Sequence, residues 1–320
     1  MFDFEHSLKF NEKEKDLDLL TVGELLVDMI SEGYSDSYEY SRYHRYFGGS
    51  PANIAMNTKR LGIRPLVASA VGTDGLGLFL VEHLQRAGMD TSCVQHVHEA
   101  TSLVVVTKSK STPVPIFYRG ADYRLTYTEE LRSALLRTKI IHFSCWPLSR
   151  QPVRSAVEQV IRDARRNGVL VCFDPNYHPA LWEKGEDGVK YIQTILPQVD
   201  IVKPSEDDAE RLFGKDTPEN QLQKFLDLGV KLVILTLGKD GVIASNGQET
   251  VKMGTLATQV TDTTGAGDAF WSGLYTALIK GYPVRKALEF GLAVSAYKLQ
   301  YTGAVVELPE LETFKTKYQI

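Results

Sequence analysis

The sequence has few cysteines and no long hydrophobic run. Its 3 cysteines, Cys93, Cys145 and Cys172, are odd in number and far apart, so we expect buried free thiols in a reducing cytoplasm. No apolar stretch reaches the ~18 residues that a membrane-spanning helix requires. The first segment, Met1–Asp18, is charged and lacks the apolar core of a signal peptide, which predicts a mobile or loosely packed extension.

Charge of one sign is not in excess either. Lys and Arg total 36, Asp and Glu total 40, and the net charge is −4, so no nucleic-acid partner is predicted. Two nucleotide-binding signatures are also missing. No G-x-G-x-x-G follows the first predicted strand, where Val22-Gly23-Glu24 stands, and no G-x-x-x-x-G-K-[ST] occurs. These absences argue against a dinucleotide-dependent dehydrogenase and a P-loop kinase.

The 320 residues, 43% of them hydrophobic, suffice for one large α/β unit with an added subdomain. Apolar strand-like runs alternate with amphipathic segments, which predicts a mostly parallel sheet covered on both faces. The run Leu17–Met29 is predicted to be one buried strand leading out to Asp28. Ser31–Phe47 and Pro113–Arg119 are predicted to form short strands outside the main sheet. The other predicted strands are 66–71, 103–107, 140–145, 169–173, 201–203, 232–237 and a 241–251 hairpin, and the helices are 52–61, 75–87, 128–137, 152–166, 187–196, 206–213, 218–228, 266–280 and 284–299.

The stretch Asp262–Phe270 (DTTGAGDAF) predicts an anion-binding loop. Apolar residues at helical spacing follow it, so Gly265-Ala266-Gly267 should begin a helix. There the first N–H groups lack partners within the helix and the dipole is positive, which favours a phosphate. Asp268 would lie in the first turn and face the same ligand. The local pattern fits equally an aspartate that only complements the helix dipole.

Polar residues follow several of the predicted strands. In an open α/β sheet, ligands bind beyond the carboxyl ends of the strands. We expect the residues at the strand ends to converge on one site: Asp28, Asp174, Asn176, Lys203, Glu206, Thr236 and Gly238.

Ser50 is predicted to cap a helix with Pro51 at its first position.

With Gly48-Gly49-Ser50-Pro51-Ala52-Asn53 near its start and Asp262–Phe270 near its end, the sequence resembles the ribokinase-like, phosphofructokinase-B type carbohydrate kinases. The second motif agrees with the family signature D-T-x-G-A-G-D-x-F at every fixed position. The resemblance implies an α/β fold of three α/β/α layers, with a mostly parallel central sheet and a small β lid. It places the kinase domain at 18–320, after an extension at 1–17, with the lid formed from 29–47 and 103–123.

The resemblance also implies roles for individual residues. Asp268 is the general base, a weak one beside the helix dipole. Lys203 departs from the asparagine of the family's N-x-x-E motif, whose glutamate is Glu206 and orders Mg²⁺ through water. The anion hole is Gly265, Ala266 and Gly267; the sugar site is Asp28, Gly48, Gly49, Asn53, Arg119, Asp174, Asn176 and Asp268; the ATP side is Lys203, Glu206, Thr236, Gly238, Gly241, Gly265 and Gly267; and Asp262 with Thr264 matches a K⁺ site.

Within the family, Phe173–Trp182 and Ile116–Thr126 are most similar to fructokinases and 2-keto-3-deoxygluconate kinases, and the whole chain to bacterial fructokinases. The implied reaction is transfer from ATP to the primary hydroxyl of D-fructose, giving fructose 6-phosphate. The alternative is a 2-keto-3-deoxygluconate kinase or another neutral-sugar kinase of the same family, and His178, where many relatives carry arginine, favours a neutral sugar. A non-catalytic sugar-binding regulator is the alternative of another class; it predicts a damaged Gly265–Asp268 loop, which is intact. Tyrosines within 34–46 predict a homodimer formed through the lid.

Overall fold

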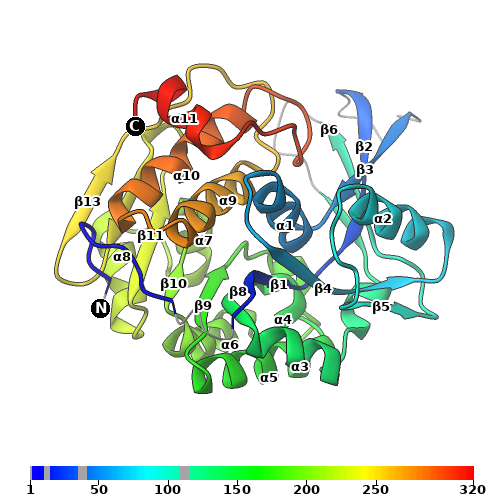
Figure 1. Ribbon diagram of the computed structural model, residues 1–320. Coiled ribbons are helices and arrows are strands. Elements are labelled where there is room, and N and C mark those ends of the chain that lie inside the picture. The colour runs from blue at the N-terminus through cyan, green and yellow to red at the C-terminus, as the bar shows by residue number, and fades with distance from the viewer. Residues whose placement is uncertain (1, 11–14, 35–41, 109–114) are drawn as a thin grey trace.

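The computed structural model describes residues 2–10, 15–34, 42–108 and 115–320 (Figure 1). Within these ranges a nine-stranded sheet forms the centre of the molecule. Its pairs are parallel except at the β11–β12–β13 edge, where the predicted hairpin adds two antiparallel strands. The strand order is β13 (Thr250–Met253), β12 (Val242–Ser245), β11 (Leu232–Thr236), β10 (Ile201–Val202), β9 (Leu170–Asp174), β8 (Thr138–Ser144), β1 (Leu17–Val22), β4 (Pro65–Gly72) and β5 (Val94–Val97).

Helices cover both faces of this sheet, so the predicted three-layer α/β/α fold is confirmed (Figure 1). The central strands are apolar on both sides because each face is buried under helices. One face carries α3 (Glu129–Leu136), α4 (Cys145–Leu148), α5 (Val153–Arg166), α6 (Gly188–Ile195), α7 (Glu206–Phe213) and α8 (Pro218–Asp227); the other carries α1 (Ser50–Arg60), α2 (Gly75–Arg86), α9 (Ala266–Ile279), α10 (Val284–Lys298) and α11 (Leu311–Tyr318).

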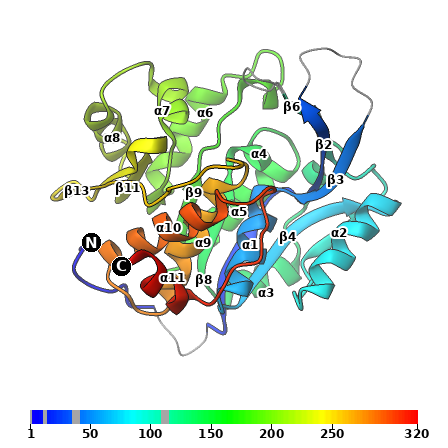
Figure 2. The ribbon, with the colours of Figure 1, turned by 90° about the horizontal axis from the view of Figure 1, so that it is seen from above.

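A second, four-stranded sheet projects from one end of the molecule (Figure 2). Its order is β3 (Tyr43–Gly48), β2 (Leu26–Tyr34), β6 (Leu103–Lys108) and β7 (Ile116–Tyr118). The predicted strand within Pro113–Arg119 is described only from residue 115 onward, and residues 35–41 of the short strands predicted over Ser31–Phe47 lie outside the described residues. We call this sheet the lid.

The prediction of one strand over Leu17–Met29 is wrong. The run is divided between β1 of the main sheet and β2 of the lid, with Gly23 (φ 151°) at the break. Asp28 therefore lies on a lid strand, paired with Tyr46, and not at the end of a main-sheet strand. The sequence hides the break because both strands are buried near it and so are equally apolar.

The N-terminal segment is packed where it is described, contrary to the predicted loose extension. Phe4 is 1% exposed and Phe2 is 6% exposed, and both join the core formed by α9, α10 and α11. The backbone oxygen of Phe4 accepts a hydrogen bond from the N–H of Arg285 at 2.9 Å. Burial of two aromatic side chains thus packs this segment against the core, although the residues around them are charged.

The elements β5, α4 and α11 were not expected from the sequence. Cys145, expected at the end of a strand, begins α4 instead, because the sheet ends at Ser144.

All three cysteines are free and buried, as predicted. Among the described helices, none combines the length and the apolar character needed to cross a membrane.

Candidate active site

A cavity of about 400 Å³ lies where the carboxyl ends of the main-sheet strands, the start of α9 and the lid meet. Most of the polar residues predicted at strand ends line it, as expected for an open α/β sheet. The lining residues are Glu24, Leu26, Asp28, Gly49, Ser50, Asn53, Val104, Trp146, Asp174, Asn176, Lys203, Ser205, Asp208, Thr236, Thr263, Thr264, Gly265, Ala266, Gly267, Asp268 and Ala304.

Helix α9 begins at Ala266, and its first turn faces the cavity. Gly265 precedes it in the left-handed region (φ 73°), and a Cβ there would lie 2.7 Å from Ala304 Cα. Only glycine fits that position. Gly265, Ala266 and Gly267 line the cavity, and the N–H of Ala266 donates to the oxygen of Thr263 at 3.2 Å. The glycine turn before a helix start matches the geometry expected of an anion-binding loop.

Asp268 lies in the first turn of α9, and its carboxylate is held by two side chains of α1. Ser50 Oγ donates to Oδ1 at 2.6 Å, and Asn53 Nδ2 donates to Oδ2 at 2.9 Å. A residue that served only the helix dipole would not need two donors from a segment more than 200 positions away. The contacts fix the direction of the carboxylate in the cavity.

The expectation that Asp268 is a weak base is wrong. Burial raises the pKa of Asp268 to about 6, although the hydrogen bonds from Ser50 and Asn53 oppose this shift. Desolvation of the carboxylate thus outweighs the hydrogen bonds that it accepts. A carboxylate with this pKa is ionised at neutral pH and is a stronger base than an exposed aspartate.

Ser50 does not cap α1 as predicted. Gly49 occupies the N-cap position without a side-chain cap, and the Ser50 hydroxyl turns to Asp268 instead. A side chain at Gly49 (φ 102°) would collide with the backbone oxygen of Glu24. The Gly48-Gly49 pair therefore allows the chain to pass close to residue 24 and to present Ser50 to the cavity.

Three polar groups lie around Asp268 on the lid side of the cavity. Glu24 Oε1 accepts from the N–H of Ser50 at 3.2 Å, whereas Glu24 Oε2 and Asn53 Oδ1 are buried without a hydrogen-bond partner among the described residues. Burial raises the pKa of Glu24 to about 8 and that of Asp28 to about 7, and the Asp268 carboxylate adds to both shifts. These oxygens without a hydrogen-bond partner and these carboxyl groups with raised pKa values are positioned to bind the hydroxyls of a ligand.

Asp174 and Lys203 form a buried ion pair at the ends of β9 and β10. Lys203 Nζ lies 3.0 Å from Asp174 Oδ2, which also accepts from Trp271 Nε1 at 2.8 Å. A Cβ placed on Gly267 would lie 3.4 Å from Lys203 Nζ, so the ammonium group approaches the anion-binding loop. Asn176, with φ 37°, lines the cavity beyond this pair.

Glu206 is not in the cavity. It is exposed at the start of α7, whereas Asp208, two residues later, is buried and lines the cavity. Asp208 accepts from the N–H groups of Tyr177 (2.7 Å) and Ser205 (3.0 Å), and burial raises its pKa. Ser205 is the N-cap of α7, and the helix then turns Asp208 toward the cavity and Glu206 toward solvent.

The predicted nucleotide-side residues separate into two groups. Thr236, at the end of β11, lines the cavity, but Gly238 and Gly241 lie in the short 3₁₀ turn that follows it and do not. A side chain at Gly241 (φ 91°) would collide with the backbone of Met253. Gly241 is thus required by the packing of the β12–β13 hairpin.

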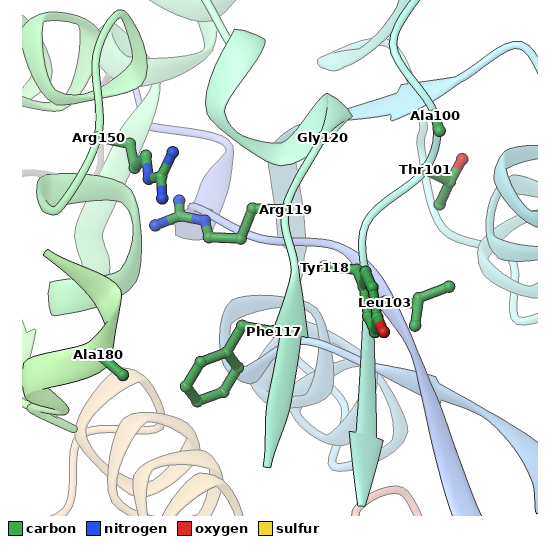
Figure 3. Close-up of a pocket in the computed structure, with 9 residues that line it drawn as sticks. All are labelled: Ala100, Thr101, Leu103, Phe117, Tyr118, Arg119, Gly120, Arg150 and Ala180. Carbon is green, nitrogen blue, oxygen red and sulfur yellow. The ribbon is translucent and has the colours of Figure 1, made fainter. Parts of the chain in front are cut away.

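Arg119 is also outside this cavity. Its side chain is 4% exposed and forms an ion pair with Asp122 at 2.6 Å, and Asp122 in turn accepts from Trp146 Nε1 at 2.6 Å. Arg119 faces Arg150 in a separate cavity of about 580 Å³ (Figure 3). Arg119, whose guanidinium lies over the Trp146 ring at 4.8 Å, therefore lines a different cavity from the carboxylates predicted to share its ligand.

The sequence did not single out Glu24, Trp146 or Asp208 as site residues, and it gave Ser50 a capping role. Glu24 stands beside Gly23 inside an apolar run, and an isolated charge in such a run was the one available signal.

Groups of three or more His, Cys, Asp or Glu residues that could hold a metal ion are absent from the described part of the chain. A metal ion here would depend on the ligand's own oxygens as well as Asp174 and Asp208.

Comparison with known proteins agrees with this architecture. The chain matches the family described as pfkB family carbohydrate kinase over residues 16–311. It is 59% identical to the ATP-dependent 6-phosphofructokinase of Thermoanaerobacterium thermosaccharolyticum, over 100% of this chain and 99% of that protein. The solved fructokinase of Halothermothrix orenii has a TM-score of 0.78 at 42% identity and covers 86% of this chain and 98% of its own.

A candidate ribokinase II of Escherichia coli, solved in complex with ATP and Mg²⁺, has a TM-score of 0.83 at 25% identity and covers 95% of this chain and 99% of its own. The whole chain is therefore accounted for by one family, as the two sequence motifs indicate. The chain belongs to the pfkB family and is a carbohydrate kinase.

Proposed function

We propose that the chain transfers the γ-phosphoryl group of ATP to a hydroxymethyl group of a fructose unit. The observation that carries the proposal is the Asp268 carboxylate, held by Ser50 and Asn53 at the start of α9. Asp268 takes the proton of the acceptor hydroxyl as that oxygen bonds to the γ-phosphorus. The bond between the γ-phosphorus and the β,γ-bridging oxygen breaks, and ADP leaves.

The start of α9 acts on the transferring group. Phosphoryl transfer has a loose transition state whose charge is spread over the equatorial oxygens, so catalysis is mainly positioning and charge stabilisation. The amides of Gly265, Ala266 and Gly267 supply donors for those oxygens. Lys203, paired with Asp174, adds a fixed positive charge next to Gly267.

ATP is proposed to lie on the side of Thr236 and Asp208, away from the lid. Mg²⁺ usually keeps several waters and binds through one or two carboxylates plus the phosphates of a nucleotide. Asp208 and Asp174 are the carboxylates on that side of the cavity, and they replace Glu206 in the expected role. Mg²⁺ supplies charge neutralisation for the phosphate oxygens when bound.

Fructose 6-phosphate is the leading acceptor, which makes fructose 1,6-bisphosphate the product. The relative that is 59% identical over the whole chain carries that activity in its name. Asp28 also lines a neighbouring cavity of about 500 Å³ between the lid and the 260–264 segment, and the cationic residue Lys108 lines it as well. A sugar phosphate extending past Asp28 would meet this cation.

Free D-fructose, the acceptor expected from the sequence, is the second candidate. The 42% identical fructokinase supports it, and so do the carboxyl groups of Glu24 and Asp28, which favour neutral hydroxyls over a phosphate. The deciding experiment is a coupled ADP-release assay over fructose 6-phosphate, fructose, 2-keto-3-deoxygluconate and ribose. The proposal fails if neither fructose compound has the highest kcat/KM.

A further inference from the structure

The segment Thr261–Thr264, which leads into the anion-binding loop, is fixed by several contacts. Asp262 Oδ1 accepts from the N–H of Thr264 at 2.9 Å, and Oδ2 accepts from the N–H of Gly303 at 2.8 Å. The N–H of Thr261 donates to the oxygen of Leu299, just after α10, at 2.7 Å. The position of the anion-binding amides therefore depends on how this segment is held.

The last residue of α10 places a positive charge against the same segment. The Lys298 side chain is 0% exposed, and its Nζ donates to the backbone oxygen of Asp262 at 2.7 Å and lies 4.0 Å from Oδ2. Burial lowers the pKa of Lys298, while the carboxyl groups of Asp262 and Asp268 oppose that shift. A lysine is rarely buried this completely unless its charge is paired, so the contact is specific.

Asp262 and Thr264 do not fit the K⁺ site implied by the family resemblance. Both carboxylate oxygens of Asp262 already accept N–H groups, and Lys298 lies at its backbone oxygen. An inorganic cation at this oxygen would lie next to the Lys298 ammonium in a buried place, where like charges repel strongly. The chain's own ammonium group takes the position that a monovalent cation would need.

We infer that Lys298 is the built-in cation of the anion-binding loop, so that phosphoryl transfer by this chain requires neither K⁺ nor Na⁺. Lys298 is a positioning residue: it holds Asp262, and through the following residues it holds the amides at 265–267. The inference rests on the proposed phosphoryl transfer, but it holds for any acceptor.

The first test changes only the salt. Initial rates of the wild-type chain are measured in KCl, NaCl and tetramethylammonium chloride at equal ionic strength, with ATP as its tetramethylammonium salt and excess MgCl₂. We expect kcat to agree within about twofold in the three salts, since no transition-state contact is lost. A fall of about tenfold or more in tetramethylammonium chloride would overturn the inference.

The second test removes the ammonium group. Lys298→Ala should lower kcat in tetramethylammonium chloride by about 10²-fold, the scale of a ~1 Å misplacement of groups that position the reacting atoms. Because the truncation leaves room for an ion, KCl or NH₄Cl should restore part of kcat and raise the melting temperature. If kcat of Lys298→Ala in tetramethylammonium chloride equals that of the wild type, the inference is contradicted.

Lys139→Met is the matched control. Lys139 is another buried lysine, 8% exposed and 2.9 Å from Asp18 Oδ1, at the opposite end of β8 from the cavity. The Lys139→Met variant should have a lower melting temperature than the wild type but the same kcat, and K⁺ should change neither quantity. If the wild-type chain phosphorylates no acceptor in any salt, the proposed function fails, and the K⁺-dependent melting temperature of Lys298→Ala still tests the cation position.

Discussion

Asn53 Nδ2 donates a hydrogen bond to Asp268 Oδ2 at 2.9 Å and so joins residues 215 positions apart. Asn53 belongs to α1, which begins after the Gly48-Gly49 pair, and Asp268 belongs to the first turn of α9. The two sequence motifs are therefore two halves of one site. In the proposed reaction, this contact orients the carboxylate that takes the proton of the acceptor hydroxyl.

Asp268→Asn should keep ATP binding but lower kcat by ~10²-fold or more, because a positioned base is lost while the shape is retained. The measurements are ADP release and calorimetric titration with ATP. Asp227→Asn, an exposed aspartate of α8, is the control and should behave as wild type. Turnover near that of the wild type would remove Asp268 from the role of base.

Ser50→Ala should change the pH profile. The pKa of Asp268 is raised to about 6 by burial, and the Ser50 hydrogen bond lowers it. A base must be deprotonated, so wild-type kcat/KM should fall as the pH drops through about 6. Without the Ser50 donor the pKa rises further, and the fall should begin at a pH higher by up to about one unit. Ser50→Thr keeps a hydroxyl and should restore the profile; an unmoved acid limb in Ser50→Ala would count against this contact.

Lys108→Met should separate the two acceptors. If Lys108 binds the phosphate of fructose 6-phosphate, its loss should raise KM for that acceptor about tenfold or more, the scale of a charge-assisted hydrogen bond. KM for fructose should stay unchanged. Lys59→Met, an exposed lysine at the end of α1, is the control. Equal effects on both acceptors would rule out a phosphate contact.

Phe4→Ala should destabilise the fold by about 3–5 kcal/mol, the range for removing a buried phenylalanine. The side chain is 1% exposed and packs with α9, α10 and α11. The measurement is urea unfolding followed by tryptophan fluorescence. Lys9→Ala changes an exposed residue of the same segment and should leave the urea midpoint of unfolding unchanged. Equal midpoints for the two variants would instead support the prediction of a loosely packed extension.

The homodimer through the lid stays a prediction, and the exposed apolar residues of the lid allow a direct test. Tyr34, Ile116 and Tyr118 are 68%, 52% and 57% exposed. Ile116→Glu should dissociate a dimer formed there, because a charge is costly to bury in an interface. Light scattering after size exclusion measures the mass. Leu78→Glu, at a 54% exposed site on α2, should leave it unchanged, and a monomeric wild-type chain would refute the prediction.

Local pattern predicted much of the fold. The alternation of apolar strands and amphipathic helices indicated a covered parallel sheet, since burial on both faces favours apolar residues at most positions of a strand. It failed at Leu17–Met29, where one apolar run serves two sheets. It also failed at the N-terminus, because the burial of Phe4 depends on distant helices.

The sequence by itself determined the glycine turn before α9 and the position of Asp268 in the first turn of that helix, because glycine spacing and helix polarity are local properties. The tertiary structure decided what is not local. It turned Ser50 from a cap into a partner of Asp268, brought Asp208 rather than Glu206 to the cavity, and put Arg119 in a separate cavity. It also raised the pKa of Asp268, because desolvation depends on everything packed around a group and not on its neighbours in the chain.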